Sequence, residues 1–193
     1  TGFMTDLVDA AISKINDPRV TITTRFNPFF KVADNLGSCW IVREQMKSDF
    51  LILNGDTLVS EEIVRTVQQD SAWPITVTVD VKNAYDSDDM KVQREDEQLI
   101  HIGKTLTADV SNAESIGFLA FRGEGVELFR ETVRQAMHTP EGVQHWYLKV
   151  IDSIAPTGKV GTKSIEGLEW AEVDFLNDIE IATALTDRWA SAG

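Results

Sequence analysis

The sequence is poor in the residues that build disulfides and zinc sites. Among its 193 residues there is one cysteine, Cys39, so the chain cannot form an internal disulfide. None of the three histidines, His101, His138 and His145, lies at zinc-ligand spacing from this cysteine. We therefore expect Cys39 to be a small buried or half-buried residue rather than a metal ligand or a crosslink.

Long hydrophobic runs are also missing. No stretch approaches the roughly 20 apolar residues that a membrane-spanning helix needs. The opening segment TGFMTDLVDAAISKIND has no charged region followed by an apolar block, as a secretory signal would. The content of 42% hydrophobic and 25% charged residues is typical of a soluble globular protein. These features predict a cytoplasmic protein without a membrane partner, with residues 1–193 forming a single domain.

Basic charge is scarce. With 18 Lys and Arg against 31 Asp and Glu, the formal net charge is -13. A polyphosphate backbone requires a basic stripe, which this sequence lacks, so we expect no nucleic-acid partner. A small phosphorylated ligand is compatible with the composition, because a divalent cation held by carboxylates reverses the local field.

The residues that are present alternate between helical and strand-like patterns. Apolar residues recur at helical spacing or cluster as β-branched runs, with short connections between them. In the first half, the pattern predicts helices over 6–15, 37–46 and 60–69, and strands over 20–24, 50–53 and 73–81. In the second half, it predicts a hairpin over 90–103, strands over 115–121 and 168–175, and helices over 125–137, 143–154 and 177–190.

This alternation predicts an α/β fold. The apolar run Phe50 to Leu53 does not alternate with polar residues, as expected for a strand buried on both faces. We therefore expect a mostly parallel, mixed sheet with helices on both faces, in which ligands gather at the carboxyl ends of the strands.

Two acidic residues follow predicted strands at such ends. Asp56 comes after Phe50 to Leu53, where Gly55 permits a tight turn, and Asp174 ends the strand of LEWAEVDF. If both strands belong to one sheet, the two carboxylates face each other and suit Mg²⁺. The alternatives are that Asp56 is a turn residue and that Asp174 is the N-cap of the next helix.

Several segments together resemble one enzyme family. DFLILNGDTLVSEEIV and WAEVDFLNDIEIA resemble the two metal-binding segments of the nucleotidyltransferases that activate sugar phosphates and alcohol phosphates. YDSDDMKVQREDEQLIHIGKTL and ESIGFLAF look like the acceptor half of the branch that includes phosphocholine cytidylyltransferases, and FNPFFKVADNLGSCWIVREQM resembles the passage before the first metal segment. The resemblance implies a Rossmann-like, GT-A-like three-layer sandwich.

One departure from the family pattern concerns phosphate binding. Members begin with a glycine-rich loop of the form L-A-A-G-x-G-S-R, and this sequence contains no such loop. The resemblance therefore implies an N-terminally truncated domain that lacks its first βαβ portion.

The resemblance also implies roles for individual residues. Asp56 and Asp174 would hold Mg²⁺, and Lys91 and Lys104 would lie beside the phosphates, although both lysines could instead be solvated strand-edge residues. The residues implied on the nucleotide side are Asn35, Ser38 and Gly55. Asn35 and Ser38 are equally suited to ordinary helix capping.

The resemblance also implies that acidic and aromatic residues bind the acceptor. Glu114 and Asp89, with Asp88 beside it, would face a cationic head group, and Trp146 and Tyr147 would add aromatic faces of the kind that bind quaternary ammonium. The alternative for the aromatic pair is packing in the core.

The implied reaction is attack by an acceptor phosphate oxygen on the α-phosphorus of a nucleoside triphosphate, with release of pyrophosphate. We expect CTP as the nucleotide and a small alcohol phosphate such as phosphocholine as the acceptor. A sugar-1-phosphate nucleotidyltransferase and a non-catalytic binding or regulatory module are the alternatives. Apolar surface exposed on a sheet without its first strands also predicts association into a homo-oligomer.

Overall fold

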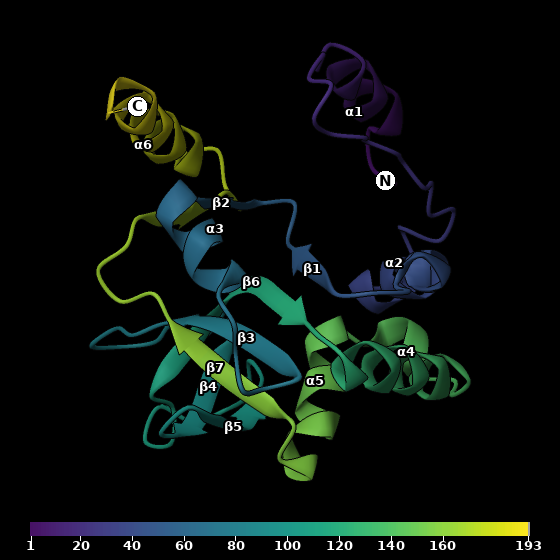
Figure 1. Ribbon diagram of the computed structural model, residues 1–193, viewed down its shortest axis with the longest axis vertical. Helices are drawn as coiled ribbons and strands as arrows, with labels where there is room; N and C mark the ends of the chain where they lie inside the picture. Colours follow the sequence, from purple (N-terminus) through teal and green to yellow (C-terminus); the bar gives the residue numbers. More distant parts are fainter. Residues whose placement is uncertain (193) are drawn as a thin grey trace.

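The computed structural model describes residues 1–192, which form a large mixed sheet, a small two-stranded sheet and six α-helices (Figure 1). The strands are β1 (Phe50–Leu53), β2 (Thr57–Val59), β3 (Ile75–Asp80), β4 (Lys91–Glu95), β5 (Gln98–Ile102), β6 (Ala113–Phe121), β7 (Val160–Ser164) and β8 (Trp170–Glu172). The helices are α1 (Thr5–Ile12), α2 (Asn35–Val42), α3 (Glu61–Gln68), α4 (Glu124–Met137), α5 (Tyr147–Ile154) and α6 (Asp178–Ala192).

The large sheet has the order β1-β6-β3-β7-β5-β4. The expected α/β fold with a mixed sheet is confirmed, but β6 runs antiparallel between β1 and β3. The pairing β3–β7 is parallel, and the other pairings of the described strands are antiparallel. Fewer strand pairings are therefore parallel than the sequence predicted.

Helices cover both faces of this sheet and make three layers. On one face, α2, α4 and α5 contribute Leu36, Phe129 and Ile151 to the larger core cluster. On the other face, α3 packs Ile63 and Val67 against β6. Ser60 caps α3, the helix predicted over 60–69, by accepting a hydrogen bond from the backbone N–H of Ile63. Packing between these layers holds in place the strand ends at which the candidate site lies.

Two predicted strands differ from the structure. Residues 20–24 form no strand, because no neighbouring strand pairs with them, and Val20 and Ile22 are exposed. The strand expected over 168–175 is the short β8, which pairs with β2 instead of joining the large sheet.

The two ends of the described chain lie away from the large sheet. Figure 1 shows α1 and α6 at one end of the molecule, and no residue of α1 is buried. β1 occupies the neighbouring edge of the large sheet. Among the described residues, no helix combines the length and apolar character that crossing a bilayer requires.

Candidate active site

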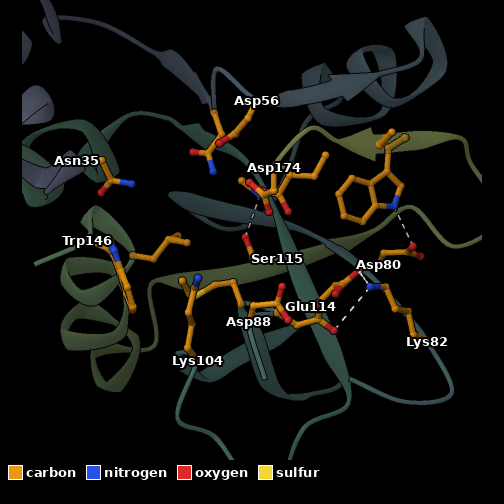
Figure 2. Close-up of a pocket in the computed structure, with 18 of the residues that line it drawn as sticks. Asn35, Asp56, Asp80, Lys82, Asp88, Lys104, Glu114, Ser115, Trp146 and Asp174 are labelled. Atoms are coloured by element: carbon orange, nitrogen blue, oxygen red, sulfur yellow. Dashed lines mark hydrogen bonds and ion pairs between the residues drawn. The ribbon is translucent and has the colours of Figure 1, made fainter. Parts of the chain in front are cut away.

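A cavity of about 550 Å³ lies at the strand ends of the large sheet. The chain leaves β1 and β3 here at Asn54 and Asp80, while β6 enters with Glu114 and Ser115. Residues around the start of α5, including Trp146, close another side (Figure 2). This is the edge at which open α/β sheets collect ligands.

The cavity wall is strongly acidic. Seven carboxyl groups and two lysines line it: Asp56, Asp80, Asp88, Asp89, Glu114, Glu172 and Asp174, with Lys82 and Lys104. Carboxylates crowded in this way repel an anionic ligand unless cations offset their charge. An anion can therefore bind among them only together with added positive charge.

Three of the acids converge. Ligand oxygens of Asp56, Glu172 and Asp174 all lie within 4.8 Å of one another. The convergence expected for Asp56 and Asp174 is therefore present, but the β2–β8 pair produces it rather than the large sheet. Thr57 pairs with Glu172, and the N–H of Val173 donates to the carbonyl of Asp56 at 3.0 Å.

Glu172 was not predicted from the sequence. Its signal is the spacing of two between Glu172 and Asp174, which places alternate side chains of an extended segment on one face. Desolvation in the cavity raises the pKa of Glu172, and the negative charges of Asp174 and Asp56 raise it further. A cation bound between the three carboxylates would relieve this repulsion.

The capping alternative for Asp174 does not hold in the structure. The backbone N–H groups of Asp174 and Phe175 donate to the carboxylate of Asp178, at 3.0 and 2.7 Å. Asp178 is also the first residue of α6. The carboxylate that organises the start of this helix is therefore that of Asp178.

The two predicted lysines lie in different surroundings. Lys104 lines the cavity, where its ammonium lies 5.1 Å from the centre of the Trp146 ring. Lys91 is buried beneath the loop that follows β3, and its ammonium donates to the carbonyls of Asp86, Ser87 and Asp89, at 2.7, 3.4 and 3.4 Å. The structure thus gives Lys91 a loop-fixing position and does not bring it to the cavity.

Lys82 is the second cavity lysine and was not predicted from the sequence. Its ammonium lies 2.6 Å from Glu114 and 3.6 Å from Asp89. Burial raises the pKa of Glu114 to about 7, against the opposing effect of Lys82.

Asp80 was also not predicted from the sequence. It accepts a hydrogen bond from the indole N–H of Trp170 at 2.9 Å. The available signal was the position of Asp80 and Lys82 at the end of the strand predicted over 73–81.

The two predicted aromatic residues are separated by the start of α5. Trp146 lines the cavity and is 39% exposed, so its ring can meet a ligand. Tyr147 points into the core and donates its hydroxyl to Asn54 at 3.0 Å. Burial raises the pKa of Tyr147. The structure therefore offers the ring of Trp146 to the cavity and keeps Tyr147 out of it.

Gly117 explains why Asn54 holds its place beside Tyr147. A Cβ atom on Gly117 would lie 2.4 Å from the side-chain nitrogen of Asn54, and the backbone φ there is +71°. Only glycine combines this close approach with a left-handed backbone. Gly117 thus lets the amide of Asn54 pack at the cavity wall.

The three residues expected near the nucleotide do not form one cluster. Asn35 lines the cavity, and its side-chain oxygen accepts the N–H of Tyr147 at 2.8 Å. Ser38 instead lines a separate, open hollow and accepts a hydrogen bond from Asn27 at 3.2 Å. Gly55 is exposed outside the cavity lining, and its φ is not positive, so the turn does not require glycine there.

Comparisons with known proteins identify the fold. No family model and no curated protein sequence matches the chain. Solved structures do match. The inositol-1-phosphate CTP transferase from T. maritima has a TM-score of 0.71 at 15% identity, with 92% of this chain and 69% of that chain covered.

Two further structures agree. The CTP:phosphocholine cytidylyltransferase from Streptococcus pneumoniae has a TM-score of 0.73 at 13% identity, over 95% of this chain and 75% of that chain. A Bacillus anthracis protein assigned as a glucose-1-phosphate thymidylyltransferase has a TM-score of 0.67 at 13% identity, over 94% and 71%. The chain therefore has the fold of these nucleotidyltransferases.

Proposed function

We propose that this chain is a magnesium-dependent nucleotidyltransferase domain that transfers a cytidylyl group from CTP to a small alcohol phosphate such as phosphocholine. In the balanced reaction, an acceptor phosphate oxygen forms a bond to the α-phosphorus of CTP, and the bond from that phosphorus to pyrophosphate breaks. The observation that carries the proposal is the convergence of Asp56, Glu172 and Asp174 at a cavity in this fold.

The donor set fits Mg²⁺. Three carboxylates with ligand oxygens within 4.8 Å supply hard oxygen ligands, and their exposure to the cavity leaves room for water and substrate oxygens. When bound by Asp56, Glu172 and Asp174, Mg²⁺ supplies the positive charge that allows phosphate groups to enter an acidic cavity.

The protein's own residues position the reactants. Lys104 offers a cation beside Trp146, and Lys82 offers one on the opposite side of the cavity, where Glu114 orients it (Figure 2). Held in place by protein contacts, such charges stabilise phosphate groups without large reorganisation. Asn54 and Ser115 also line the cavity and add polar side chains to its wall.

The residues that line the acidic cavity also support the proposed acceptor. The ring of Trp146 and the carboxylates of Asp88 and Asp89 suit a cationic head group. A second candidate, a sugar-1-phosphate acceptor, is favoured by one observation: Glu114 is already paired with Lys82, and Tyr147 is buried, so a complete aromatic cage is not assembled.

The metal site can be tested by binding measurements on the purified chain. We expect Asp56→Asn and Asp174→Asn each to weaken Mg²⁺ or Mn²⁺ binding in calorimetry at least about tenfold, since each removes one anionic ligand. Asp187→Asn, on the exposed face of α6, is the control and should bind as the parent does. Equal affinities in all four proteins would contradict the site.

Turnover tests the function itself. Pyrophosphate release is measured with CTP, Mg²⁺ and a panel of phosphocholine, inositol-1-phosphate and glucose-1-phosphate. Highest release with phosphocholine supports the proposal, and highest release with a sugar phosphate supports the second candidate. If metal binds but CTP yields no pyrophosphate with any acceptor of the panel, the result contradicts the proposal and favours the alternative of a non-catalytic binding module.

A further inference from the structure

A second cavity lies behind the wall of the acidic one. It measures about 310 Å³ and is enclosed by the turn after β5, which contains Lys104 and Leu106, and by the start of α5, which contains Trp146 and Lys149. Four residues line both cavities and form the partition between them: Met90, Lys104, Trp146 and Leu148. We call this second space the partition cavity.

The partition cavity has the opposite charge to its neighbour. Its lining contains two lysines, Lys104 and Lys149, two histidines, His101 and His145, and a single acid, Asp152. It lies in a chain with a net charge of -13, so a local excess of cationic groups is a distinct feature. Such a site favours an anion.

The single acid is already compensated. One oxygen of Asp152 accepts the backbone N–H of Ile102 at 3.1 Å and lies 3.2 Å from the ring nitrogen of His101. Its other oxygen accepts the ammonium of Lys149 at 3.2 Å. The ammonium of Lys104 lies over the ring of Trp146, and its positive charge acts at longer range on Glu172 of the acidic cavity. A cation thus remains for a ligand even after Asp152 is satisfied.

The rest of the lining is mostly apolar, and Thr105 and Gln144 are its polar members. Ile102 and Leu148 are buried, Leu106 is half-buried, and Trp146 adds an aromatic face. The cavity is near the lower end of the size range of small-molecule sites. Its apolar walls and few charged groups favour ligands that have both an apolar part and a charged group. Inorganic anions would leave the apolar walls uncovered, and hydrocarbons would leave the lysines unused.

We propose that the partition cavity binds a small organic anion, whose apolar body packs on Leu106, Leu148 and Trp146 and whose phosphate or carboxylate group pairs with Lys104 and Lys149. The site is separate from the proposed metal site. Because Lys104 and Trp146 belong to both cavities, occupation of the partition cavity changes the affinity of the acidic cavity for its own ligand, and the effect is reciprocal.

The experiment is a titration of the ¹⁵N-labelled chain in the presence of EDTA, followed by NMR. Removal of divalent cations keeps the acidic cavity closed to anions, so the result does not depend on the proposed nucleotidyl transfer. The probes are phenyl phosphate and benzoate. Benzyl alcohol, which lacks charge, and inorganic phosphate, which lacks an apolar body, are the controls.

We expect saturable shifts for Gly103, Leu106, Lys149 and the indole of Trp146 with phenyl phosphate or benzoate, and much weaker binding of both controls. The stronger of the two probes identifies the preferred anionic group. Absence of saturable shifts with both probes would overturn the proposal. Shifts centred on Asp56 and Asp174 instead, or equal affinity for inorganic phosphate, would also overturn it.

Two variants locate the ligand. Lys149→Gln should weaken binding by at most about fivefold, as expected for one exposed charge pair, and Leu106→Glu should abolish it because it adds a negative charge to the cavity. Lys159→Gln removes a lysine that pairs with Glu124 elsewhere and should leave binding unchanged. Unchanged affinity in a folded Leu106→Glu variant would place the ligand elsewhere and refute the site.

Discussion

Glu114 and Lys82 form the most deeply placed ion pair of the acidic cavity. The side chain of Glu114 is 3% exposed, whereas that of Lys82 is 40% exposed, so one partner is desolvated and the other reaches water. The loss of solvation therefore outweighs the attraction of Lys82 and raises the pKa of Glu114 to about 7. The pair sits at the strand ends, where a ligand would change its solvation.

This pKa predicts a pH dependence of stability. Between about pH 4.5 and 7, the folded chain keeps a proton on Glu114 that the unfolded chain has already lost. The free energy of unfolding should therefore fall as pH rises through this window, by up to about 1.4 kcal/mol per pH unit from this group.

Urea unfolding of the parent and of Glu114→Gln over this pH range isolates the effect. The difference in unfolding free energy, parent minus variant, should decrease with rising pH, because other groups cancel. Glu166→Gln, at an exposed position, is the control and should give a flat difference. A flat difference for Glu114→Gln as well would show that folding does not raise the pKa of Glu114.

At the scale of elements, the small β2–β8 pair assembles the three converging carboxylates. Asp56 comes directly before β2, while Glu172 and Asp174 lie at the end of β8 and beyond it. The hydrogen bond from the N–H of Val173 to the carbonyl of Asp56, 3.0 Å long, extends the ladder to the acids themselves. The geometry of the proposed metal site thus depends on a backbone contact.

Val173→Pro tests this dependence because proline has no N–H to donate. We expect Mg²⁺ or Mn²⁺ affinity to fall about 10- to 100-fold, as for the loss of a group that orients metal ligands. Val173→Ala keeps the N–H and is the matched control. Circular dichroism checks that the large sheet persists. If Val173→Pro binds metal as well as Val173→Ala does, the ladder does not set the site.

Local signals explain which elements the sequence predicted. The hairpin predicted over 90–103 is present as β4 and β5, and the helix predicted over 60–69 is present as α3, which begins after the capping Ser60. Residues 20–24 have strand propensity but no partner, and β-propensity acts through packing against neighbouring strands. Pairing between segments far apart in sequence, such as β2 with β8, leaves no local pattern to detect.

The same distinction applies to the candidate site. Asp56 and Asp174 were predictable because acids after strands are visible in the sequence, and the structure brings them together. Lys91 was assigned to phosphate from the family resemblance, but the direction of its side chain depends on how the loop 86–89 folds over it. Lys82 was missed because its use depends on Glu114, which is distant in sequence.

At the scale of the molecule, net charge and exposed apolar surface have opposite effects on self-association. A net charge of -13 favours separation of copies in solution. Against this, β1 lies at an edge of the large sheet, and its Leu51 and Leu53 are 40% and 44% exposed. A strand edge with unpaired backbone groups and apolar side chains is a template for pairing with another strand.

We therefore predict association through the β1 edge that strengthens with salt. Salt screens the repulsion between acidic copies and leaves the apolar contact intact. Sedimentation velocity of the parent should show a mass that rises with protein and salt concentration. Leu51→Lys with Leu53→Lys should keep the chain monomeric, because the lysines charge the edge. Val110→Lys with Val143→Lys makes the same charge change at exposed apolar positions away from β1 and should associate as the parent does. Association of the β1 variant at parental strength, or its loss in both variants, would show that the strand edge is not the contact.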